Sequence, residues 1–154
     1  MRQLLNIALF AFVCCLFAAC GGESNTVLIK TNKGDITVLL FDETPRHKDN
    51  FLKLANEGLY EGTLFHRVIP QFMIQGGDHQ SKGAAPNTPL GGGGPGYLID
   101  HEIGQPHLRG ALAAARTNNP EKKSSGSQFY IVTGQPQSEA TLNQFESMKG
   151  IKYS

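Results

Sequence analysis

Two runs of mainly apolar, β-forming residues after residue 26, separated by a short polar segment, predict a β-hairpin. Residues 27–31 and 36–41 are rich in β-branched and other apolar side chains, and residues 32–35 separate them. Gly34, inside that separating segment, supplies the positive φ that a tight turn favours. Both faces of the second run carry apolar residues, which is typical of a strand covered on both sides.

An amphipathic helix is predicted directly after the hairpin. Phe51, Leu54 and Ala55 lie at positions i, i+3 and i+4 and would form its buried stripe. The pair Thr44-Pro45 fits the N-cap and first helical positions, and Gly58 fits the end of the helix.

Four further strands, a long loop and a second helix are predicted in the rest of the chain. Ten of the 18 glycines lie in residues 76–110, so this stretch should be mostly loop. Ser138 as N-cap and Gly150 as stop bound an amphipathic helix over residues 138–149. The stretches that predict strands are residues 64–68, 72–75, 110–115 and 127–132.

Residues 1–19 are predicted to be a secretory signal peptide of the lipoprotein type. Arg2 supplies a basic start, residues 4–17 are apolar, and Ala18-Ala19-Cys20 is a small-residue exit. The apolar stretch is shorter than a membrane-spanning helix. Cys20 resembles the lipidated cysteine of a bacterial lipobox. Ordinary signal-peptidase cleavage at the same small residues, which would give a soluble periplasmic protein, is the alternative.

The net charge of the chain limits the kinds of partner that it can bind. Removal of residues 1–19 takes away one of the 14 basic residues, which leaves 13 against 13 acidic residues. A neutral chain without a basic run argues against nucleic acid as a partner and against electrostatic membrane binding. We therefore expect an exported, periplasmic protein that is anchored to a membrane through lipid on Cys20. Residues 20–26 would be a tether and residues 27–154 one domain.

The run FHRVIPQFMIQGGD, residues 65–78, carries the clearest candidate chemistry. It brings Arg67, the large apolar side chains Phe72 and Met73, and the amide Gln75 onto two short extended segments. A permanently charged guanidinium beside an apolar slot suits a reaction that needs electrostatics and shape but no nucleophile.

Other candidate chemistries have weaker patterns. In Asp100-His101-Glu102, adjacent side chains of an extended segment point to opposite faces, which is poor metal-ligand geometry. The glycines at 91–94 lack the Lys-Ser/Thr of a phosphate loop. The serines at 124, 125 and 127 near His107 lack a nucleophile-elbow pattern. We therefore expect no metal site, no phosphate loop and no hydrolase.

Together with SSGSQFYI, residues 124–131, the run resembles the cyclophilin-type peptidyl-prolyl cis-trans isomerases. Further matching stretches lie at residues 49–52, 60–63, 94–97 and 109–117. The resemblance implies a mainly β fold with flanking helices, a cyclophilin-like antiparallel β-barrel. The closing strands and helix of the family pattern do not follow residue 132, so we expect an incomplete barrel, truncated at its C-terminal side.

The resemblance also implies roles for individual residues. Arg67 would be the central catalytic residue, supported by Gln75, and no cofactor would be needed. The substrates would be X-Pro segments of unfolded or flexible exported proteins, whose folding the chain would assist. A non-catalytic proline-peptide binding or chaperone module, or an inactive fragment, is the alternative. The residues implied to bind substrate are His66, Phe72, Met73, Ala115, Arg116, Gln128 and Tyr130.

Overall fold

A computed structural model describes residues 25–150 and divides the chain into two units, residues 1–39 and 40–154. The predicted signal peptide and Cys20 lie outside the described residues. No helix within residues 25–150 has the length and apolar character needed to cross a membrane.

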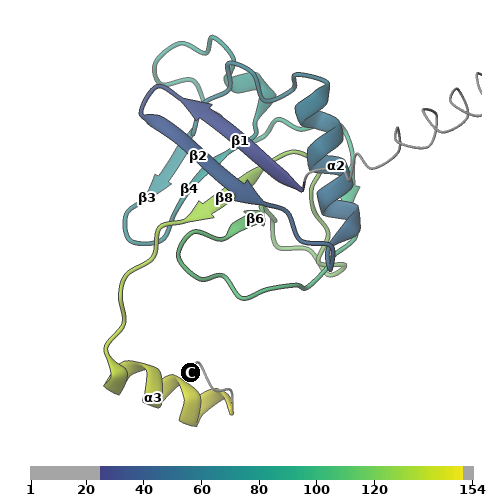
Figure 1. Cartoon of the computed structure of the whole chain (residues 1–154). Coiled ribbons are helices and arrows are strands. Elements are labelled where there is room, and N and C mark those ends of the chain that lie inside the picture. Colours follow the sequence, from purple (N-terminus) through teal and green to yellow (C-terminus); the bar gives the residue numbers. More distant parts are fainter. Residues whose placement is uncertain (1–24, 151–154) are drawn as a thin grey trace, which may run out of the picture. The chain divides into compact units, whose positions relative to one another are not determined.

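The described part of the first unit is the predicted β-hairpin (Figure 1). Strand β1, Thr26–Thr31, pairs antiparallel with β2, Gly34–Leu39, so that Thr31 lies opposite Gly34. Gly34 has φ 125°, and the Thr31 hydroxyl donates to its carbonyl over 2.6 Å. The sequence placed the hairpin correctly but started β2 two residues late and ended it two residues late.

In the second unit, helix α2 spans Pro45–Asn56 and buries Leu54, as predicted. Its C-terminal end closes in a Schellman arrangement, with Gly58 N–H bonded to the Ala55 carbonyl and Leu59 N–H to the Leu54 carbonyl. Gly58 has φ 71°, which favours glycine.

The N-terminal end of α2 corrects one prediction. Thr44 occupies the N-cap position, but its side chain makes no capping hydrogen bond. Glu102, which lies far away in the sequence, accepts instead from the backbone N–H groups of Arg46 (3.1 Å) and His47 (3.0 Å). The helix is therefore capped by a tertiary contact that local sequence patterns do not reveal.

The second unit also contains a four-stranded antiparallel sheet. Its strand order is β3-β4-β8-β6, and β5 and β7 pair separately. The sheet ends at β3 on one side and at β6 on the other, so the strands of the described residues do not close into a barrel. The two-residue strands β5 and β7 were not predicted, because so short a strand has no recognisable periodicity. The bounds are β3 Arg67–Ile69, β4 Met73–Gly76, β5 Leu98–Ile99, β6 Leu112–Ala114, β7 Ser124–Ser125 and β8 Phe129–Val132, with a short 3-10 helix η2 at His79–Ser81.

The core behind this sheet is an aromatic cluster centred on Phe129. The Phe129 ring centroid lies 5.5 Å from that of Phe51 on α2 and 5.6 Å from that of Tyr60. Phe65 approaches the same ring edge-on at 6.1 Å. Edge-to-face contacts of this kind add to the stabilisation from burial alone. The cluster fixes β8, and with it the side chains on the other face of the sheet.

Helix α3, Glu139–Lys149, is present as predicted. The Ser138 hydroxyl accepts from Thr141 N–H over 3.2 Å, and Gly150 ends the helix in the left-handed conformation. Phe145 and Met148, on the apolar side of this helix, are exposed.

Candidate active site

The register of the sheet places three predicted site residues in one row. Arg67 on β3 lies opposite Gln75 on β4, and Gln75 lies opposite Tyr130 on β8. Directly opposed residues in a sheet point to the same face, and residues two positions apart share that face. Arg67, Gln75 and Tyr130 therefore lie on one face, and Phe129 packs into the core on the other.

A chain of hydrogen bonds links this row to Gln128. Arg67 Nη1 donates to Gln75 Oε1 at 3.4 Å, a long contact, and Gln75 Nε2 donates to Gln128 Oε1 at 2.9 Å. The Arg67 side chain is exposed, so its remaining N–H groups face solvent. The arrangement presents a fixed positive charge on an open face of the sheet.

Aromatic side chains lie beside that charge. The turn between β3 and β4 has Pro70 second and Gln71 third, with Gln71 at φ 66°, and Phe72 N–H closes it on the Ile69 carbonyl. Phe72 follows the turn and is 49% exposed, with its ring 6.1 Å from that of Tyr130. These two rings form an accessible apolar surface next to the predicted catalytic arginine.

Most of the remaining predicted site residues are buried. Met73 is only 2% exposed, although its position two residues from Gln75 on β4 puts it on the same face of the sheet. Ala115 is buried, with its N–H bonded to the Gln128 carbonyl, while Arg116 is exposed. Both imidazole nitrogens of His66 are buried and have no hydrogen-bond partner among the described residues.

Two neighbours of the site make contacts with it that the sequence did not reveal. The first is the glycine segment 91–93, whose carbonyl groups at Gly91 and Gly93 accept from Gln128 Nε2. The second is His107, whose Nδ1 lies 2.9 Å from the Tyr130 hydroxyl and whose ring packs edge-on against Tyr130. Burial raises the pKa of Tyr130 more than the Arg116 charge lowers it, so the phenol stays neutral. No local sequence pattern predicts these contacts, because each joins distant parts of the chain.

Comparison with known proteins identifies the family. The profile described as "Cyclophilin type peptidyl-prolyl cis-trans isomerase/CLD" matches residues 26–148. This chain belongs to the cyclophilin family. A Synechococcus elongatus peptidyl-prolyl cis-trans isomerase is 42% identical over 106 residues, which cover 68% of this chain and 66% of the relative. Peptidyl-prolyl cis-trans isomerase A of Dickeya dadantii is 41% identical over 70% of this chain and 54% of the relative.

A solved cyclophilin has the same fold. The crystal structure of a Cryptosporidium parvum cyclophilin type peptidyl-prolyl cis-trans isomerase matches with a TM-score of 0.60 at 33% identity, covering 79% of this chain and 83% of that one. The same protein has been solved in the presence of the dipeptide Ala-Pro. The part of this chain that aligns with the Synechococcus elongatus and Dickeya dadantii relatives spans about two thirds or less of the length of those proteins.

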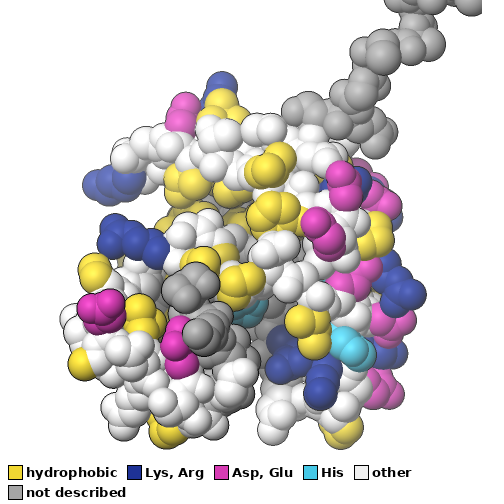
Figure 2. All heavy atoms as spheres, turned by 60° about the horizontal axis from the view of Figure 1, so that its bottom comes forward, with side chains coloured by type: hydrophobic (Ala, Val, Ile, Leu, Met, Phe, Trp, Pro, Cys, Tyr) yellow, Lys and Arg dark blue, Asp and Glu magenta, His cyan; other side chains and the backbone are white. Residues whose placement is uncertain are grey.

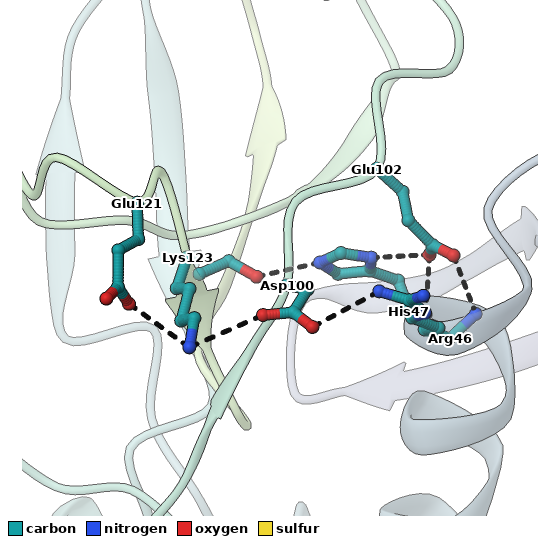
Figure 3. Close-up of polar contacts among 7 residues, drawn as sticks. Arg46, His47, Asp100, Glu102, Glu121 and Lys123 are labelled. Atoms are coloured by element: carbon teal, nitrogen blue, oxygen red, sulfur yellow. Dashed lines mark hydrogen bonds and ion pairs between the residues drawn. The ribbon is translucent and has the colours of Figure 1, made fainter.

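A second polar cluster of this cyclophilin lies at the N-terminus of α2 (Figure 3). Glu102 Oε2 lies 2.7 Å from His47 Nδ1, and His47 Nε2 lies 2.7 Å from Ser124 Oγ. Burial raises the pKa of Glu102, but the hydrogen bonds from His47 and the backbone outweigh it and hold that pKa below its ordinary value. Although this is the order of a Ser-His-acid triad, Ser124 is buried at 5% exposure. The geometry thus favours a structural clamp over a nucleophile.

The neighbouring ion pairs are surface features. Asp100 contacts Arg46 at 3.3 Å and Lys123 at 3.5 Å, and Lys123 also contacts Glu121. Asp100 and Glu102, which the sequence offered as a weak metal triplet with His101, are thus engaged in separate contacts. Figure 2 shows acidic and basic side chains interspersed along one edge of the face it presents, in keeping with the near-zero net charge of the cyclophilin domain.

Proposed function

We propose that this chain catalyses cis-trans isomerisation of X-Pro peptide bonds. Three findings support the proposal: membership of the cyclophilin family, the names of the relatives, and the structure of a related protein in the presence of Ala-Pro. The observation that carries it is the row of Arg67, Gln75 and Tyr130 on one sheet face, next to the exposed Phe72.

The chemistry requires little more than this row. An X-Pro bond rotates slowly because amide resonance sets a barrier of about 20 kcal/mol. A hydrogen-bond donor that reaches the prolyl nitrogen localises its lone pair and weakens that resonance. Arg67 can supply such a donor without proton transfer, since its guanidinium is charged at every working pH.

The surrounding side chains hold the peptide and the arginine. Phe72 and Tyr130 offer an apolar surface that fits a proline ring. Gln75 accepts from Arg67 and so restricts the directions in which the guanidinium points. Positioning of this kind lowers the barrier only if the contact is better in the twisted state than in the planar one.

The size of the effect is reasonable for such a site. Each factor of ten in rate corresponds to about 1.36 kcal/mol, so an acceleration of five to six orders needs roughly 7–8 kcal/mol. One preorganised donor supplies about 2.7–4 kcal/mol of transition-state stabilisation in well-studied enzymes. The apolar surface and the desolvation of the bound proline would provide the remainder.

Replacement of Arg67 tests the proposal. We expect Arg67→Ala to lower kcat/KM for an Ala-Pro peptide by roughly 100- to 1,000-fold while peptide affinity changes little. Arg67→Lys should restore only part of the rate, because an ammonium lacks the planar fork of the guanidinium. Equal loss of rate and affinity would instead favour the second candidate, a proline-peptide binding or chaperone module. No change in either quantity would contradict both the role of Arg67 and the location of the site.

We propose further that the substrates are unfolded or flexible exported proteins, and that lipid on Cys20 anchors the chain. The support is the sequence alone, in which an apolar segment ends in Ala18-Ala19-Cys20. The intact mass of the native protein tests this, because a diacylglyceryl or triacyl addition on residue 20 would be lost in Cys20→Ala. A native mass with no lipid would contradict the anchor.

A further inference from the structure

A buried carboxylate lies behind the candidate active site, at Asp78. This residue is 0% exposed and lies two residues after Gly76, the last residue of β4. Asp78 Oδ2 accepts from Gly91 N–H at 2.6 Å and from Gly93 N–H at 3.2 Å. Asp78 Oδ1 accepts from Gln80 N–H at 2.8 Å. A buried ion of this kind is expensive unless its oxygens are satisfied, and here both are.

The glycine segment 91–93 is held on its other side by Gln128. Gln128 Nε2 donates to the Gly91 carbonyl at 2.9 Å and to the Gly93 carbonyl at 2.7 Å. The same two residues therefore give their N–H groups to Asp78 and their carbonyl groups to Gln128. The segment is a bridge between the buried carboxylate and the active-site face.

This bridge decides how the two active-site amides are oriented. An amide NH₂ has two protons, and both of those on Gln128 are used by the glycine carbonyls. Only Oε1 of Gln128 is left to face Gln75, so the group that Gln75 turns toward it must be its NH₂. Gln75 Oε1 then points to Arg67 and accepts from its guanidinium. The orientation of each group follows from the one before it.

The charge state of Asp78 supports the same picture. Burial raises its pKa, but the N–H groups of Gly91, Gln80 and Gly93 and the neighbouring His66 outweigh burial and hold the pKa below its ordinary value. The carboxylate is thus ionised at neutral pH and accepts throughout. Space is tight as well, since a Cβ on Gly93 would collide with the Asp78 carboxylate.

We propose that Asp78 is a positioning residue for Arg67, acting through the glycine segment 91–93, Gln128 and Gln75. The inference rests on the proposed isomerase function and extends it to a residue that does not contact substrate. Loss of the carboxylate would leave the Gly91 and Gly93 N–H groups without their acceptor and allow the segment to shift. The Gln128 amide could then turn over, and the acceptor that directs the guanidinium would be lost. Turnover should fall, while peptide binding on Phe72 and Tyr130 should persist.

The test compares Asp78→Ala with the conservative Asp78→Asn in the full chain. We expect Asp78→Ala to lower kcat by roughly 5- to 30-fold with KM changed less than threefold. Asp78→Asn should recover part of kcat, because its single oxygen can still accept from Gly91 and Gly93, while its NH₂ then faces the Gln80 N–H that the carboxylate accepted. Asp100→Ala is the matched control: it removes an exposed carboxylate outside the bridge and should leave kcat unchanged. Equal kcat in wild type and a folded Asp78→Ala would overturn the proposal.

A double-mutant cycle separates positioning from a general loss of stability. In a Gln128→Met background the bridge is already broken, so Asp78→Ala should have no further effect on kcat. A full additional loss of kcat in that background would overturn the proposed route.

A measurement on the wild-type chain does not depend on variant folding or on activity. The Gln128 side-chain NH₂ protons should exchange slowly with solvent, because both are hydrogen-bonded to carbonyl groups, and fast exchange would overturn the proposal. A wild-type chain without isomerase activity would instead contradict the proposed function, and the exchange of these protons would still decide whether the bridge exists.

Discussion

Glu102 should contribute more to the stability of α2 than Thr44, although Thr44 occupies the N-cap position. Glu102 accepts three hydrogen bonds at this end of the helix. Two come from the backbone N–H groups of Arg46 (3.1 Å) and His47 (3.0 Å), and the third joins Glu102 to His47 Nδ1 (2.7 Å). Its side chain is 13% exposed, so water does not readily replace these bonds. The Thr44 hydroxyl makes one long contact, 3.4 Å to the Phe41 carbonyl, and caps nothing.

The expected magnitude follows from these contacts. Loss of a helix N-cap costs about 0.5–2 kcal/mol, and a hydrogen bond to a charged group contributes about 1.5–3 kcal/mol. Because the three bonds share one carboxylate, we expect Glu102→Ala to lower the free energy of unfolding by about 2–4 kcal/mol. Glu102→Gln keeps one acceptor oxygen and should cost about half as much. Thr44→Ala should cost less than about 0.5 kcal/mol.

Urea unfolding followed by far-ultraviolet circular dichroism measures these differences, since the chain has no tryptophan to report them. With an m value of about 2 kcal/mol/M, a loss of 2 kcal/mol lowers the urea midpoint by about 1 M. The reasoning is refuted if Thr44→Ala lowers the midpoint as much as Glu102→Ala does. It is refuted equally if neither substitution moves it.

The stabilisation that Glu102 contributes should be lost as the pH falls. Its folded-state pKa lies below the ordinary value of 4.5. A carboxyl whose pKa is lowered by folding stabilises the protein above its unfolded pKa and loses that contribution as pH falls through the folded one. The difference in unfolding free energy between wild type and Glu102→Gln should therefore be constant near neutral pH and shrink below about pH 4.5. A difference that grows on acidification would contradict the assignment.

Two further predictions concern packing and the aromatic surface. Gly77→Ala should destabilise the fold by about 3 kcal/mol or more, because Gly77 has φ 85° and a Cβ there would collide with the Ser127 carbonyl. Gly34→Ala should cost only about 1–2 kcal/mol, because Gly34 has φ 125° but open space around it. Thermal melts of the two variants measure the difference. Tyr130→Phe should remove the hydrogen bond to His107 and keep the apolar surface, so that kcat/KM changes less than about threefold; a loss as large as that of Arg67→Ala would mean that the hydroxyl takes part in catalysis.

The sequence predicted most of the fold because its signals are local. Strand periodicity, the glycine stops and the Ser138 cap each depend on residues within a few positions, and the structure has the corresponding elements. Thr44 shows the limit of that reasoning. Its type and position are those of a cap, yet the carboxylate of Glu102 occupies the space around the first N–H groups and takes the role.

In the candidate site, too, some residues were named from the sequence and others were not. Arg67, Gln75 and Tyr130 were named from the family resemblance, and the strand register of the structure places them in one row on one sheet face. The residues that hold the row in place could not be predicted. Asp78 and His107 reach their partners through loops whose course depends on the packing of the whole unit, and no spacing in the sequence encodes it.

The central claim is that this chain turns X-Pro bonds over, and two-dimensional exchange NMR on an Ala-Pro peptide tests it most directly. Uncatalysed exchange takes tens of seconds or longer, so cross-peaks between the cis and trans resonances at short mixing times report catalysis alone. With substoichiometric full chain we expect such cross-peaks, and with folded Arg67→Ala we expect them to weaken to near the uncatalysed level. A folded wild-type chain that produces no exchange above that level would contradict the claim.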